Sequence, residues 1–182
     1  MASGTSSFEE DSNLFSCVFQ DEFEDNEELA SILEDMSILW IDALAYVLNV
    51  IIANMDVTVR RRKIVHPSTF LKEEDKDFAI RLLDESIIRY DEYIDLVSAN
   101  LPNWKSERLV PADAALIVLG LSEAVTFPTI PVKATINEYV EISKYYSTPN
   151  SRIFVNGVLD KLIQEKVASG EIRKQGRGLL EN

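Results

Sequence analysis

The stretch TFPTIPVKATINEYVEISKYYSTPNSRIFVNGVLDKL, residues 126–162, decides the fold because it contains two helices whose starts can be read from the sequence. Pro131 and Pro149 each indicate the start of a helix. In the first helical turn the amide hydrogen that proline lacks needs no partner, and the fixed φ of proline suits the helix. Apolar residues then recur at three- and four-residue steps on both sides of residues 145–148. Because so short a segment can only reverse the chain, we predict a hairpin of two helices.

The same periodicity extends upstream. Apolar residues recur at helical steps over 27–52, with a break near Ser37, and again over 78–97 and 111–125, where Pro111 opens the last of these helices. No stretch alternates in the manner of a strand. We therefore expect an all-α bundle of about six or seven helices.

The most apolar window of the chain, residues 38–55, raises the question of a membrane span. Asp42, Asn49 and Asn54 interrupt it, and a helix that crosses lipid rarely accepts an aspartate near its middle. We interpret the window as a buried helix, and we expect no membrane partner.

The acidic charge of the chain is concentrated at one end. The net charge is −13, and residues 1–56 hold thirteen Asp or Glu but no Lys or Arg, whereas the remainder holds eighteen of each sign. Residues 1–26 are interpreted as an acidic, partly disordered arm without a helical period. Such an arm repels a phosphate backbone. The basic run 60–63 is interpreted as a solvated helix end rather than a nucleic-acid site.

Cysteine and histidine usage limits the chemistry. Cys17 and His66 are the single cysteine and histidine, so neither an internal disulfide nor a Cys/His zinc site can be assembled. This fits a reducing cytoplasm. His66 precedes Pro67 and is interpreted as a turn residue. No nucleophile with a histidine partner, phosphate loop or metal cluster is evident, so we expect neither an enzyme nor a cofactor.

Three phrases identify a family resemblance. IPVK at 130–133, INEYVEISK at 136–144 and FVNGVLDK at 154–161 resemble the NusB family of bacterial transcription antitermination factors, in the same order. The resemblance covers about residues 68–180, through Trp104, and is greatest to a long-form branch with KYYSTP, here 144–149, and a Gly-Arg-Gly tail, here 176–178. It implies two packed helical bundles. It also implies binding of boxA RNA together with the ribosomal protein NusE, in the antitermination complex of RNA polymerase.

The resemblance also implies a site. Phe154 is the expected RNA contact, since an aromatic face can stack a base, and a core phenylalanine is the equally weighted alternative. Asp113 is expected on the surface that faces NusE. Close helix approach is the first explanation for Gly157, and close approach of an RNA backbone is the second. The remaining RNA-binding candidates, for phosphates or base edges, are Lys133, Ser151, Arg152, Asn156 and Lys161.

The chain also departs from the family pattern. Ala114 and Val118 stand where arginines are expected, and the arginine-rich first helix that contacts boxA RNA is missing. We therefore expect a truncated copy, in which an exposed apolar patch favours a homodimer. The alternatives are a protein-interaction domain that retains the NusE surface with little RNA affinity, or an accessory RNA-binding domain like that of some rRNA cytosine methyltransferases. The expected segments are an arm (1–26), an N-terminal helical segment (27–66), a NusB-like bundle (67–170) and a basic flexible tail (171–182).

Overall fold

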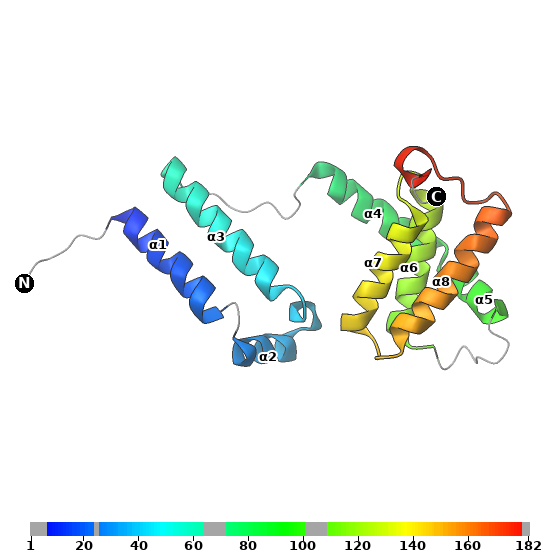
Figure 1. The fold of residues 1–182 in the computed structure, drawn as a ribbon, viewed down its shortest axis with the longest axis horizontal. Coiled ribbons are helices and arrows are strands. Elements are labelled where there is room, and N and C mark those ends of the chain that lie inside the picture. Colours follow the sequence, from blue (N-terminus) through cyan, green and yellow to red (C-terminus); the bar gives the residue numbers. More distant parts are fainter. Residues whose placement is uncertain (1–6, 24–25, 64–71, 101–108, 180–182) are drawn as a thin grey trace, which may run out of the picture. The chain divides into compact units, whose positions relative to one another are not determined.

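The structure is a computed structural model that describes residues 7–23, 26–63, 72–100 and 109–179. It forms two compact units, Met1–Leu71 and Lys72–Asn182, and each is described by itself. The described residues hold eight α-helices and no strand (Figure 1). This confirms the all-α prediction, although the number of helices exceeds the expected six or seven. Trp104 and His66 lie outside the described residues.

The first unit begins with a helix that the sequence interpretation missed. α1 spans Phe8–Val18 and continues into a π-helical turn, Phe19–Phe23. Ser7 and Glu10 form a reciprocal capping box, and the acidic residues of the first turn suit the positive end of the helix. The aromatic rings follow a four-residue period, because Phe15 stacks on Phe19 and Phe19 meets Phe23 edge to face. The expectation of an arm without helical period is therefore corrected over residues 8–23.

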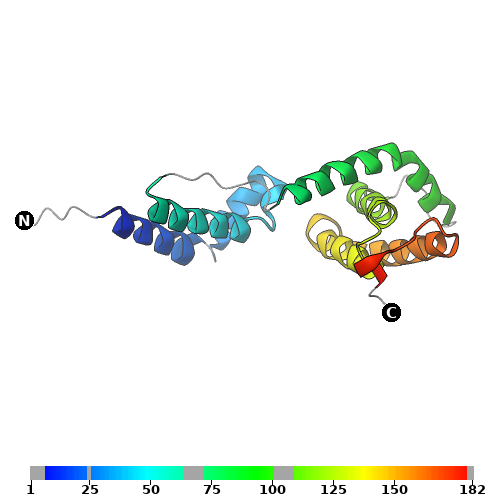
Figure 2. The ribbon, with the colours of Figure 1, turned by 90° about the horizontal axis from the view of Figure 1, so that it is seen from above.

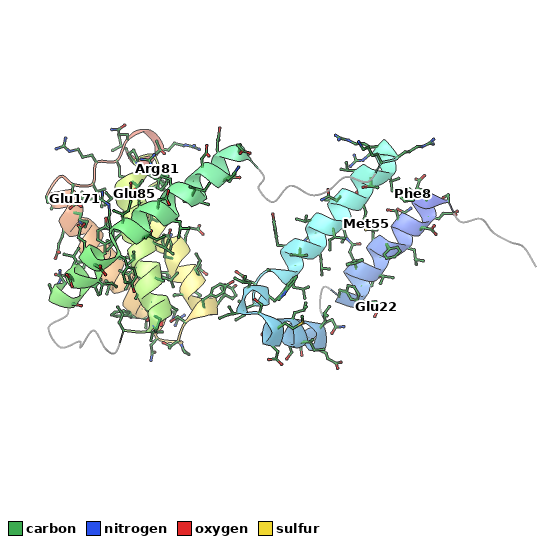
Figure 3. The ribbon with its side chains drawn as sticks, turned by 180° about the vertical axis from the view of Figure 1, so that it is seen from behind. Phe8, Glu22, Met55, Arg81, Glu85 and Glu171 are labelled. Carbon is green, nitrogen blue, oxygen red and sulfur yellow. The ribbon has the colours of Figure 1, made fainter. Side chains whose placement is uncertain are left out.

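The rest of the first unit follows the predicted break. α2 spans Glu27–Met36, Ser37 then caps a short 3-10 turn at Ile38–Trp40, and α3 spans Leu44–Arg61. α1 lies alongside α3, and Figure 3 labels Phe8 on the first and Met55 on the second. The expectation of a buried helix over 38–55 is corrected, since Leu48 is buried but most other apolar side chains of α3 are half-buried or exposed. The basic run lies at the exposed C-terminal end of α3, as expected.

In the second unit, α4 (Glu73–Ile88) and α5 (Tyr90–Asn100) pack on one side of α6 (Pro111–Thr126). α7 (Val132–Tyr146) and α8 (Ser151–Ala168) pack on the other side. Figure 2 shows α6 almost end-on between these two layers. α6 is buried around most of its circumference, which explains its nearly continuous apolar sequence. Its fully buried Ile117 and Leu121 share a core with Tyr93 of α5 and Leu159 of α8.

The helix starts lie close to the predicted prolines. Pro111 is the first residue of α6, Pro131 is the N-cap of α7, and Pro149 precedes the first residue of α8 by two positions. α7 and α8 pack on each other, which confirms the hairpin. The reversal itself is Ser147–Asn150, two residues later than expected, because Tyr145 and Tyr146 still belong to α7.

The basic segment after α8 is docked on the bundle. Ile172 is buried, and the amide of Gln175 donates to the carbonyl of Pro128 at 2.9 Å. A short 3-10 turn follows at Gly176–Leu179, where a Cβ at Gly178 would collide with the same Pro128 carbonyl oxygen. The expectation of a flexible tail is therefore corrected for residues 171–179: the docked backbone needs glycine at this close approach.

Candidate nucleic-acid interface

α8 carries most of the residues that the sequence nominates for RNA. Its inward side chains are buried against α6 and α7, which fixes the rotation of the helix: Val155, Val158, Leu159, Leu162 and Ile163. Because of this rotation, the other side chains of α8 fall on two different flanks of the helix.

The first flank is a groove between α7 and α8, hereafter the α7–α8 groove. It encloses about 750 Å³, and its floor is apolar, with Ile136 and Ile163 among the lining residues. The polar lining includes two of the nominated RNA residues together with amides that the sequence interpretation missed: Lys133, Asn137, Asn156 and Gln164. Asn137 and Gln164 could have been nominated from the sequence only by noting that each lies on the polar side of its predicted helix.

The second flank is a shallow pocket of about 230 Å³, hereafter the Phe154 pocket. Phe154 and Lys161 line it together with Asn100, Ile153 and Gly157. The Phe154 ring is half-buried and packs against the core, so it is partly a core side chain and partly a surface one. Lys161 is exposed one helical turn beyond Gly157. The structure therefore places two of the six nominated residues, Lys133 and Asn156, in the α7–α8 groove and two, Phe154 and Lys161, in the Phe154 pocket. Ser151 and Arg152 line neither.

Gly157 does not mark a close approach of helices. A Cβ built there would meet no described atom within 4 Å, so the first explanation offered for this glycine is wrong. The residue is exposed and lies between Phe154 and Lys161 on the same flank. Its missing side chain leaves this part of the pocket wall bare.

Ser151 and Arg152 differ in access although they are neighbours. Arg152 is exposed, whereas Ser151 is only 1% exposed. The Ser151 hydroxyl donates to Oδ2 of Asp113 at 2.9 Å, and the amide of Thr148 donates to the same hydroxyl. The Ser151 side chain is thus engaged within the chain.

Asp113 lies inside the bundle rather than on a surface. It is 3% exposed, and its Oδ1 accepts a hydrogen bond of 2.5 Å from the Ser147 hydroxyl while Oδ2 accepts the one from Ser151. The expectation of an outward-facing carboxylate is therefore corrected. Contact between this residue and NusE remains a prediction.

A second buried carboxylate of α6 was not foreseen. Glu123 accepts hydrogen bonds from the Thr135 hydroxyl at 2.6 Å and from the Tyr139 hydroxyl at 2.9 Å. Burial, followed by the adjacent charge of Glu123, raises the pKa of Tyr139. The spacing of Thr135 and Tyr139, four residues apart on one face of α7, is the signal that could have found the pair.

Two further findings concern metals and membranes. In the part of the chain that the structure describes, no three His, Cys, Asp or Glu side chains are grouped so as to hold a metal ion. None of the described helices is long and apolar enough to cross a bilayer.

Comparison with known proteins agrees with this hairpin and its surroundings. A model of the NusB family matches residues 42–164. The transcription antitermination protein NusB of Salinibacter ruber is 34% identical over 105 residues, 58% of this chain and 66% of that protein. Its counterpart in Chloroherpeton thalassium is 31% identical over 130 residues, 68% of this chain and 62% of that protein.

The NusB of Methylacidiphilum infernorum is 35% identical over 95 residues, 52% of this chain and 66% of that protein. The chain thus spans slightly less than two thirds of the length of each of these relatives. No solved structure is significantly similar to it. Since the family model covers more than half of the chain, this protein belongs to the NusB family of transcription antitermination proteins.

Proposed function

We propose that the protein acts in transcription antitermination by binding boxA RNA together with the ribosomal protein NusE. The observation that carries this proposal is the family match over residues 42–164, which includes α7 and the part of α8 that bears both flanks. The names of the relatives, transcription antitermination proteins, support it.

The Phe154 pocket is the part of this surface best suited to a single-stranded base. The half-buried ring is held against the core, so stacking costs little side-chain entropy, and an aromatic face contributes about 1–3 kcal/mol per stacked base. Lys161 supplies a cation at the other end of the pocket for a phosphate. The bare wall at Gly157 lets a ribose or phosphate approach the helix backbone.

The α7–α8 groove is the second part of the proposed surface. Lys133, Asn156 and Gln164 offer one cationic and two amide side chains, which suit phosphates and base edges. Asp160 lies in the same lining and disfavours a continuous phosphate track there. We therefore assign the groove to contacts with base edges and the Phe154 pocket to stacking.

A titration of labelled boxA RNA at several salt concentrations, with and without NusE, tests the proposal. Phe154→Leu retains the apolar contact with the core but removes the aromatic face, whereas Phe154→Tyr retains both. We expect Phe154→Leu to weaken boxA binding by about tenfold or more, in line with the loss of one stacked base, and Phe154→Tyr to bind like the wild type. Binding should weaken as salt rises.

The controls separate the two flanks and the two candidate functions. Asn156→Ala should weaken binding less than Phe154→Leu, because the amide is one of several polar groups in its groove. Equal affinity of the Leu and Tyr variants would show that Phe154 serves only the core. Residues 1–56 hold thirteen Asp or Glu and no Lys or Arg, and this negative charge repels RNA phosphates. It favours a second candidate function, that of a NusE-binding protein with little RNA affinity. If the wild-type chain binds NusE but does not bind boxA RNA, that second candidate is supported instead.

A further inference from the structure

One buried carboxylate connects the starts of two helices that are distant in sequence. Asp113 lies in the first turn of α6. Its two oxygens accept hydrogen bonds from Ser147, 34 residues away in the reversal after α7, and from Ser151, 38 residues away at the first position of α8. The charge therefore lies where the positive ends of both helices can stabilise it.

The hydroxyl protons can be assigned consistently. Ser147 and Ser151 each have a single hydroxyl proton, and both protons point to Asp113. The Ser151 oxygen then accepts from the Thr148 amide at 3.2 Å and from the Thr148 hydroxyl at 2.8 Å. These bonds form a connected network, hereafter the Asp113 network, that comprises Asp113, Ser147, Thr148 and Ser151.

This network joins the start of α8 to the start of α6. Asn150, the N-cap of α8, makes no side-chain capping bond. Its carbonyl accepts from the amide of Phe154 at 3.3 Å, the usual backbone hydrogen bond of a first helical turn, so the backbone at Phe154 is tied to the end of the reversal. The hydrogen bond from Ser151 to Asp113 is thus a polar contact between the first turn of α8 and α6, and that turn carries the Phe154 ring.

We infer that Asp113 is a positioning residue, whose network with Ser147 and Ser151 holds the first turn of α8 and thereby sets the Phe154 ring for RNA. This inference rests on the function proposed above. In this role Asp113 contacts neither RNA nor a partner protein. The buried carboxylate instead binds the hydroxyls of Ser147 and Ser151, which hold the helical turn that carries the RNA-contacting Phe154.

The chain supplies a matched control for this network. Glu123, near the other end of α6, is also buried and also accepts from two hydroxyls, those of Thr135 and Tyr139. Ser151→Ala and Thr135→Val each remove one hydroxyl donor from a buried carboxylate of the same helix. Both variants therefore lose one hydrogen bond to a buried carboxylate, but only Ser151→Ala changes a residue at the start of α8.

The experiment compares Asp113→Asn, Ser151→Ala and Thr135→Val in the full chain by two measurements. The first is amide hydrogen exchange of residues 154–157, which reports opening of the first turn of α8 without any ligand. The second is affinity for boxA RNA in the presence of NusE. Ser147 is half-buried, and a comparison of Ser147→Ala with Ser147→Thr tests whether a hydroxyl at this position restores both the exchange protection and the RNA affinity.

We expect Asp113→Asn and Ser151→Ala to accelerate exchange at 154–157 and to weaken RNA binding by about tenfold, as the loss of one hydrogen bond to a charged group allows. Thr135→Val should leave both readouts near wild type, and Ser147→Thr should recover what Ser147→Ala loses. Unchanged exchange in Asp113→Asn would overturn the network. Accelerated exchange with unchanged RNA affinity would overturn its positioning role. If the wild type binds no boxA RNA, the proposed function fails, and exchange alone decides whether Asp113 holds this turn.

Discussion

The Tyr139 hydroxyl donates a 2.9 Å hydrogen bond to Oε2 of Glu123 in the interior of the second unit, where the two side chains are 5% and 7% exposed. A buried carboxylate is tolerated only when hydrogen bonds replace its lost hydration. Thr135 supplies a second donor at 2.6 Å, so this charge is satisfied by two hydroxyls of α7. The pair thus joins α6 to α7 by a specific polar contact.

Removal of the Tyr139 hydroxyl should destabilise the protein. Tyr139→Phe leaves the apolar ring in place and deprives Glu123 of one donor. We expect the free energy of unfolding to fall by about 1.5–3 kcal/mol, the range for hydrogen bonds to charged groups. Urea denaturation followed by circular dichroism measures this loss. Tyr145→Phe, at an exposed position, is the control and should change little.

The same tyrosine should make the protein sensitive to alkali. Burial and the Glu123 charge raise the pKa of Tyr139, and burial raises that of Tyr93, so both phenols keep their protons in the folded state when the unfolded chain loses them near pH 10. Their contribution to stability is therefore complete below about pH 10 and decreases as the pH rises above it. Denaturation curves between pH 8 and 11 should show this decrease, with a smaller slope in Tyr139→Phe. An identical slope in that variant would contradict the explanation.

A third prediction concerns the docked basic segment. The Lys174 amine donates to the carbonyls of Ala124 at 3.0 Å and Phe127 at 3.2 Å, at the C-terminal end of α6. Arg81, labelled in Figure 3, donates to the carbonyl of Thr126 at the same helix end and lies over the Phe127 ring. Cations there satisfy free carbonyls and oppose the negative end of the helix. We expect Lys174→Ala to lower the free energy of unfolding by about 1–2 kcal/mol.

Arg177 provides the control for that measurement. It lies in the same segment and is exposed, so Arg177→Ala should change stability by less than about 0.5 kcal/mol. If the segment acted mainly by attracting RNA, both substitutions would lower boxA affinity alike and neither would alter the denaturation midpoint.

Local signals in the sequence predicted the elements well. Proline placement and apolar periodicity located α6, α7, α8 and the break between α2 and α3, because these features act within a few residues of the element that they determine. α1 was missed since residues 1–26 were interpreted as an arm without a helical period, although Phe15, Phe19 and Phe23 recur there every four residues. Their four-residue period, together with the capping pair Ser7 and Glu10, was present in the sequence and contradicts that interpretation.

The arrangement of the candidate site was harder to predict because it depends on contacts distant in sequence. Asp113 faces inward only because the start of α6 lies beside a reversal 34 residues later. Lys174 is half-buried, and its amine donates to carbonyls 47 and 50 residues earlier in the chain. Residue type and position in the family pattern identify candidate site residues. The packing of α6 against α7 and α8 decides which of these side chains face outward.

The last prediction uses two glycines that should respond to alanine with opposite signs. Gly157→Ala adds a methyl group in open space within α8, where alanine is favoured over glycine by about 1 kcal/mol, so the free energy of unfolding should rise. Gly178→Ala should lower it by about 1–3 kcal/mol, because the added carbon collides with the Pro128 carbonyl. Urea denaturation of both variants measures the two changes. If Gly157 is kept for close approach of RNA, Gly157→Ala should weaken boxA binding although it stabilises the fold. Stronger or equal RNA affinity in this variant would show that the bare wall of the Phe154 pocket plays no part in recognition.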